Sequence, residues 1–246
     1  PASFPPSHSP KTYLNKSNTM KIQLLTAAAM LLLFTGCATT DDAKSSAGKD
    51  LKNVSFENLQ KQAAKGSAEA QVALADCYRT GTGVEKDEAK AFEWAEKVAN
   101  TGNANGMLQV AKFYTNGVGV EKSPIRALQW TRKAANKGHD LAMLQLGLYH
   151  HRGLGGLEKS PLLARQWIRK SAEKGHPQAM ANLAEMFADG IGGEKNLEEA
   201  TKWLIRAAEK GHVEAQHQLG HRYENGTGVE KDIAKAFAWW LKAAEN

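Results

Sequence analysis

Small and aliphatic residues recur from residue 66 to the end of the chain at fixed distances from a glycine. Four, eight and twelve residues after that glycine come a small residue, an aliphatic residue and, in four units of five, an aromatic residue. Residues four apart lie on one face of an α-helix. The pattern therefore predicts a helix with a narrow apolar face in each unit, as in Ala70, Leu74 and Tyr78.

A glycine-containing loop and a second helix follow in each unit. The loop reads GTGVEKD from Gly81, and its text is nearly the same in the other units. A glycine just after a helical pattern is a C-terminal helix signal. The residue that ends each loop is a good N-cap: Asp87, Ser123, Ser160, Asn196 or Asp232. Each second helix then carries a tryptophan at one position: Trp94, Trp130, Trp167, Trp203 and Trp239.

The unit repeats about every 36 residues, which is typical of stacked units that contact mainly their neighbours. A shorter segment in front ends in the same way as a second helix, with Ala63, Ala64 and Lys65 before Gly66. We interpret this segment, residues 51–65, as a capping helix. The predicted repeats are 66–101, 102–137, 138–174, 175–210 and 211–246.

These residues and spacings resemble the Sel-1-like repeat, a longer-looped relative of the tetratricopeptide repeat. The resemblance covers residues 66–246, with local departures where Gly106 replaces an alanine and His150 replaces the aromatic residue of the third unit. It implies an all-α fold, a right-handed solenoid of antiparallel helix pairs with a concave face. It also implies a non-catalytic protein–protein interaction scaffold.

The front of the chain has the features of a bacterial lipoprotein. Residues 1–19 precede Met20 and are interpreted as upstream of the true start, while 20–36 have the length and apolar core of a signal peptide. Phe34 to Cys37 resembles a lipobox, so Cys37 is the expected lipidation site, and residues 37–50 are a polar tether. The alternative is a plain secretory signal with an incidental cysteine. By the family rule for lipoproteins of enteric-type bacteria, Ala38 in place of an aspartate after the lipidated cysteine indicates the periplasmic face of the outer membrane.

The charge does not favour a nucleic-acid partner. The formal net charge is +6, but three lysines precede Cys37 where there are no acidic residues, so 29 basic residues face 26 acidic residues downstream. No basic block or interleaving of basic and aromatic residues is present in the sequence. We expect no cofactor and no bound metal.

One motif offers an alternative function of a different class. Ser171 and Lys174 fit the Ser-x-x-Lys pattern of penicillin-recognising enzymes, which would suit a β-lactam- or cell-wall-acting hydrolase. The companion motifs are missing, and the equivalent residues Ala207 to Lys210 read Ala-Ala-Glu-Lys. We therefore expect a packing role for Ser171 and no enzyme.

Two histidines could begin a metal site. His217 and His221 are four apart on one helix face, and a third ligand would have to come from His176 or Glu185 in the preceding repeat. No glutamate lies between the two histidines in the metalloprotease arrangement. Surface histidines without a metal are the favoured interpretation.

Positions that differ between repeats while the frame stays constant are free to carry recognition. On the first helices these positions include a ladder of amides, which could hydrogen-bond an extended peptide, and an apolar cluster in the third repeat. The amides could equally be solvated helix formers, and the cluster could be core that compensates for His150. The predicted contact residues are Gln109, Lys112, Leu141, Leu144, Gln145, Leu148, Asn182, Glu185, Gln218 and His221. The expected partner is a protein or peptide of the cell envelope, bound by an adaptor or by an immunity protein against a secreted toxin.

Overall fold

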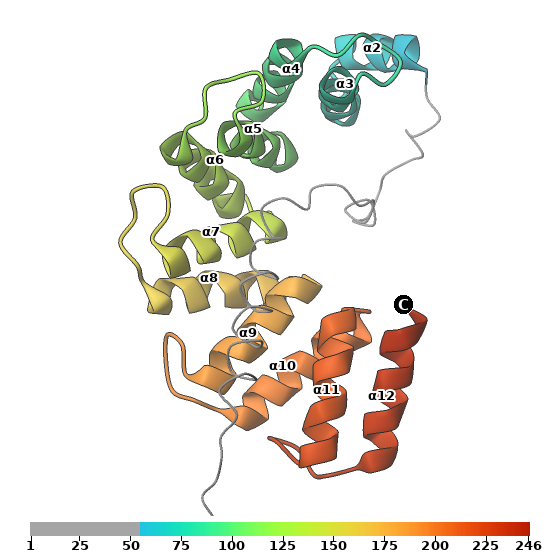
Figure 1. The fold of residues 1–246 in the computed structure, drawn as a ribbon. Helices are drawn as coiled ribbons and strands as arrows, with labels where there is room; N and C mark the ends of the chain where they lie inside the picture. Colours follow the sequence, from blue (N-terminus) through green and yellow to red (C-terminus); the bar gives the residue numbers. More distant parts are fainter. Residues whose placement is uncertain (1–54) are drawn as a thin grey trace, which may run out of the picture. The chain divides into compact units, whose positions relative to one another are not determined.

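A computed structural model describes residues 55–246 of the chain (Figure 1). The expected upstream segment 1–19, the signal peptide 20–36, the lipidated Cys37 and the tether 37–50 lie outside the described residues. The first residues of the capping segment, 51–54, lie outside them as well.

Between residues 55 and 246 the chain forms eleven α-helices and no strand. All of them except the first are 13 residues long, because every unit has the same start and stop signals. They are α2 (Phe56–Ala64), α3 (Ala68–Thr80), α4 (Glu88–Asn100), α5 (Ala104–Asn116), α6 (Pro124–Asn136), α7 (Asp140–Arg152), α8 (Pro161–Glu173), α9 (Pro177–Asp189), α10 (Leu197–Glu209), α11 (Val213–Asn225) and α12 (Ile233–Glu245).

The helices contact chiefly their neighbours in the sequence. Within a repeat the first helix packs on the second, and each second helix packs on the first helix of the next repeat. The long loops α5–α6, α7–α8 and α9–α10 leave on the same side of the stack (Figure 1). This is the expected all-α solenoid of helix pairs, with α2 in the place of the predicted capping helix.

The loops between paired helices are held by similar contacts in the five repeats. Gly117 ends α5 in the left-handed conformation at φ 71°, which glycine adopts without strain. The second loop glycine, Gly119, lies so close to the preceding second helix that a Cβ would stand 1.9 Å from the carbonyl oxygen of Glu88. The predicted N-caps are confirmed, and each cap residue also donates its backbone N–H to the residue twelve after the repeat glycine. This bond persists in the third repeat, where Ser160 bonds the carbonyl of His150 at 2.8 Å.

The core between helices is built mainly from small residues, and two of its glycines face large side chains of the paired helix. The position nine after the repeat glycine lies opposite the residue that follows the tryptophan. Where the first of these is glycine, the second is large: a Cβ on Gly147 would be 2.6 Å from Ile168 Cγ1, and one on Gly220 would be 2.2 Å from Trp240 Nε1. The five pairs are Ala75 with Ala95, Ala111 with Thr131, Gly147 with Ile168, Ala184 with Leu204 and Gly220 with Trp240.

Histidines cap three of the first helices, although the sequence does not predict these caps, because histidine is not a preferred N-cap residue. In α7, α9 and α11, Nδ1 of His139, His176 and His212 accepts the N–H of the third residue onward, at 3.1–3.4 Å. An Nδ1 that accepts leaves the proton on Nε2. The Nε2 of His139 contacts Asn105 Oδ1 at 2.8 Å, and that of His212 contacts Gln178 Oε1 at 2.9 Å. His139 therefore joins α7 to α5, and His212 joins α11 to α9.

The contact between Gly147 and Ile168 predicts that Gly147→Ala has opposite effects on stability in two backgrounds. In the wild-type chain, Gly147→Ala should lower the free energy of unfolding by about 1–3 kcal/mol, because the new methyl overlaps Ile168. In an Ile168→Ala background it recreates the Ala75 and Ala95 pair, and should raise stability by up to about 1 kcal/mol through helix propensity. Urea denaturation of the four proteins measures both effects. An equal effect of Gly147→Ala in both backgrounds would show that the pair is not matched.

The His212 cap predicts a loss of stability on acidification. Burial lowers the pKa of His212 below its ordinary value of 6.5, an effect that nearby His176 reinforces and Glu214 opposes. The unfolded chain then binds more protons, so stability is complete above about pH 6.5 and falls as the pH drops toward the folded pKa. Asparagine is the residue that caps α5. His212→Asn should therefore reduce the loss of stability on acidification by about 1 kcal/mol, the typical contribution of a cap, or ~2–4 °C in Tm. Thermal melts at pH 7 and pH 5 test this, and an unchanged difference between the two melts would contradict it.

Candidate protein-binding face

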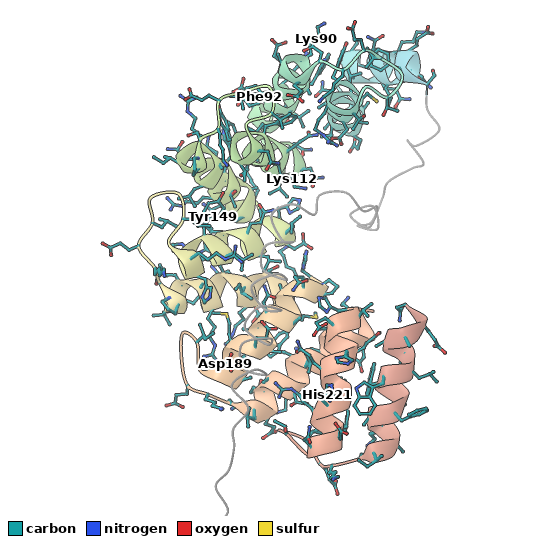
Figure 2. The ribbon with its side chains drawn as sticks, in the orientation of Figure 1. Lys90, Phe92, Lys112, Tyr149, Asp189 and His221 are labelled. Carbon is teal, nitrogen blue, oxygen red and sulfur yellow. The ribbon has the colours of Figure 1, made fainter. Side chains whose placement is uncertain are left out.

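The ten predicted contact residues all lie on the first helices of repeats two to five, which are α5, α7, α9 and α11. We call the surface of α3, α5, α7, α9 and α11 that carries these residues the first-helix face. Lys112 on α5 and His221 on α11 are labelled among its side chains in Figure 2. The structure separates these residues into those that link repeats, those that are buried and those that stay accessible.

Two of the predicted amides link neighbouring repeats. Gln109 Nε2 donates to Asp76 Oδ1 at 3.2 Å, so an amide of the second repeat holds a carboxylate of the first. Gln218 of repeat five lies near Glu185 of repeat four and lowers the pKa of its carboxyl group, and Gln218 Nε2 donates to Glu214 Oε1 at 3.2 Å. These amides are therefore partly occupied by the frame and do not form a ladder reserved for a ligand.

The middle of the ladder is less occupied. Asn182 accepts a hydrogen bond from Gln178 within α9 at 2.9 Å. The Gln145 side chain is half-buried and makes no hydrogen bond to the residues between 55 and 246. Lys112, one repeat earlier, is also half-buried. Gln145 is thus the predicted amide whose donor and acceptor both remain free for a partner.

The apolar cluster of the third repeat is mostly core, which corrects our expectation for Leu144. Its side chain is 4 % exposed and cannot contact a partner, and Leu108 at the same position of repeat two is equally buried. Leu141 and Leu148 are half-buried and pack against buried residues of the core. Only the outer edges of Leu141 and Leu148 contribute apolar surface to the face.

The end of the first-helix face is polar and partly acidic. Glu185 is exposed to water yet surrounded by protein, and this partial desolvation, with Asp189 and Glu214 nearby, raises the pKa of its carboxyl group. His221 is exposed, contacts Glu224 Oε2 at 3.2 Å and packs edge-on against His217, with ring centroids 4.8 Å apart. Within the described part of the chain, no set of three histidine, cysteine, aspartate or glutamate side chains is placed to hold a metal.

The hydrolase alternative has no accessible nucleophile. Ser171 is fully buried, and its Oγ donates to the backbone carbonyl of Asp140 at 2.8 Å. Lys174 is the exposed C-cap residue of α8. Ser171 therefore fastens α8 to the start of α7, and the motif has a structural explanation.

None of the helices between residues 55 and 246 has the length and apolar content needed to cross a bilayer.

Comparison with known proteins places these features in a family. The Sel1 repeat model matches residues 68–103, 104–139, 140–176, 177–212 and 213–246, each starting two residues after the repeat that we defined. Among curated proteins, none matches the chain significantly.

Solved structures share the fold. A Sel1 repeat protein from Oxalobacter formigenes is 32 % identical, with a TM-score of 0.70 over 78 % of each chain. The protective antigen c5321 of uropathogenic Escherichia coli is 25 % identical with a TM-score of 0.71 over 93 % of this chain, which spans only 48 % of that protein. An immunity protein from Pseudomonas aeruginosa, 21 % identical with a TM-score of 0.53, covers 77 % of this chain with 72 % of its own. The chain belongs to the Sel1 repeat family, whose repeats are suited to protein–protein interaction.

Proposed function

We propose that this chain is a non-catalytic scaffold that binds a protein or peptide of the cell envelope on its first-helix face. The observation that carries the proposal is the contrast within the repeats. The buried frame is nearly constant, whereas the accessible positions ten after the repeat glycine read Asp76, Lys112, Leu148, Glu185 and His221. A surface that changes from repeat to repeat on an unchanging frame can distinguish one partner from another.

The centre of the site is the Lys112, Gln145 and Leu148 region of α5 and α7. A half-buried amide without an internal partner can donate to and accept from a peptide group. The Gln145 amide makes no hydrogen bond that stabilises the packed repeats. Leu148 supplies apolar contact beside it, and Lys112 supplies positive charge. The partner segment therefore carries an accessible backbone or amide group next to an apolar and an acidic side chain.

We further propose that the scaffold is anchored by lipid on Cys37 to the periplasmic face of the outer membrane. The support is the signal-peptide pattern of residues 20–36 and its lipobox-like end. Such a scaffold would serve as an envelope adaptor or as an immunity protein that blocks a secreted toxin. The second role is favoured by the fold shared with solved Pseudomonas aeruginosa structures that are named immunity proteins.

Replacing the free amide tests the binding site. Gln145→Arg should abolish capture of a specific partner from an envelope extract, because it removes the amide and adds bulk at the centre of the face. Gln60→Arg on the exposed surface of α2 makes the same chemical change away from it and should leave capture unchanged. The captured protein is identified by mass spectrometry and rebound in pure form. Equal rebinding by both variants would remove this region as the site.

Replacing the cysteine tests the anchor. The full chain should incorporate radiolabelled palmitate and fractionate with the outer membrane, because acylation supplies the membrane attachment. Cys37→Ser should lose the label and leave the membrane fraction, while Cys77→Ser should behave like wild type. Labelling that survives Cys37→Ser would exclude lipidation at this residue.

A further inference from the structure

The second helices of repeats two and three differ in charge from the other second helices. Together α6 and α8 carry six basic residues and a single acidic residue, Glu173. In contrast, α4 and α10 each carry three acidic and two basic residues. The basic residues are Arg126, Arg132, Lys133, Arg165, Arg169 and Lys170.

These six cations have no carboxylate partner between residues 55 and 246. In repeats one and five, the lysine of the first turn pairs with the aspartate that caps the same helix, as Lys90 does with Asp87 at 3.0 Å. The caps of α6 and α8 are Ser123 and Ser160, which satisfy the helix N–H groups without supplying a counter-charge. The positive charge of this region is therefore left for solvent or for a partner.

One of the six basic residues, Arg165, is buried in the protein. Its side chain is 8 % exposed and its Nε is buried without a hydrogen-bond partner. Its guanidinium lies 3.9 Å from the centre of the Phe187 ring, and Arg169 lies 5.4 Å from the centre of the same ring. Burial and the nearby Arg169 both lower the pKa of Arg165. Two guanidinium groups thus meet one ring with no carboxylate beside them.

The accessible surface of these two helices repeats a mixed pattern. Residues one, five and eight after the first helical residue lie on one face, and in both helices they are an aliphatic residue, a glutamine and an arginine. All six are exposed, including Ile125 at 59 % and Leu162 at 58 %. We call this surface the outer stripe: Ile125, Gln129 and Arg132 on α6, and Leu162, Gln166 and Arg169 on α8. The equivalent residues of the other repeats are Ala89, Glu93 and Glu96, then Glu198, Lys202 and Ile205, and finally Ala234, Ala238 and Leu241.

We propose that the outer stripe is a second docking surface, separate from the first-helix face, and that it binds an acidic segment of a partner protein with interspersed apolar side chains. Carboxylates of the segment pair with Arg132 and Arg169, because a planar guanidinium group can donate two parallel hydrogen bonds to one carboxylate. The apolar side chains of the segment cover Ile125 and Leu162. Because the pattern is present in two consecutive repeats only, the segment runs across α6 and α8.

The test uses a fluorescein-labelled peptide of glutamate interspersed with leucine, titrated with the whole chain by fluorescence anisotropy at low and physiological salt. Arg132→Glu with Arg169→Glu should weaken binding about tenfold or more, because attraction becomes repulsion at two contacts. The exposed positions keep the variant folded, and a glutamate at 169 also places a carboxylate one turn from Arg165. Circular dichroism confirms the fold.

The matched control removes the same charge elsewhere. Lys97→Glu with Arg206→Glu changes two cations of the second helices in repeats one and four, and it should alter the affinity by less than about twofold. An equal loss with both pairs would show that the peptide senses only net charge, and the proposal would then fail. It would also fail if the wild-type chain bound phosphatidylglycerol vesicles but not the peptide.

The Gln145→Arg variant separates this surface from the proposed function. It should bind the peptide like wild type. Loss of peptide binding with Gln145→Arg, but not with the outer-stripe variant, would place the acidic segment on the first-helix face. That result would overturn the second docking surface and leave the proposed scaffold function standing.

Discussion

Close contact between small residues of neighbouring helices is the constraint on which the rest of this structure depends. Ala70, Ala142 and Ala215 have no exposed surface, and a Cβ on Gly106 would lie 2.7 Å from a Val98 methyl group. At this distance the loops that join the helices keep a nearly constant form. In repeats two to five the second loop glycine lies against a backbone carbonyl in the first turn of the preceding second helix, and the core glycines of repeats three and five face large side chains of the paired helix.

This frame also decides what the first-helix face can offer. Hydrogen bonds such as Gln109 with Asp76 and His212 with Gln178 hold adjacent first helices in register, so these polar groups are engaged before any partner arrives. Gln145 lies where no such bond is formed by the described residues. Some polar residues of the first-helix face therefore link neighbouring repeats, and others stay accessible to a partner. The accessible residues at its centre lie in repeats two and three.

The same two repeats carry the second helices with the largest excess of basic over acidic residues. A stack of helix pairs has two accessible surfaces per repeat, because only the faces between helices are consumed by packing. The first helices supply amides, carboxylates and histidines, and the outer stripe supplies arginines and aliphatic side chains. A scaffold built in this way can hold two partners without enlarging its core.

The sequence by itself determined the helix pairs, the N-caps of the second helices, the glycine ends of the first helices and the structural role of Ser171. Each of these follows from spacing within one repeat, where a period of 3.6 residues and a cap residue suffice. The tertiary structure alone decided which variable positions face a partner. Leu144 lies at a position that varies among the five repeats, yet it is buried, as are Leu108 and Ala181 at the same position of the neighbouring repeats. The contacts of the histidine caps, of the engaged amides and of Arg165 likewise involve residues of a neighbouring repeat. Periodicity does not reveal which of two adjacent stripes a neighbouring helix will cover.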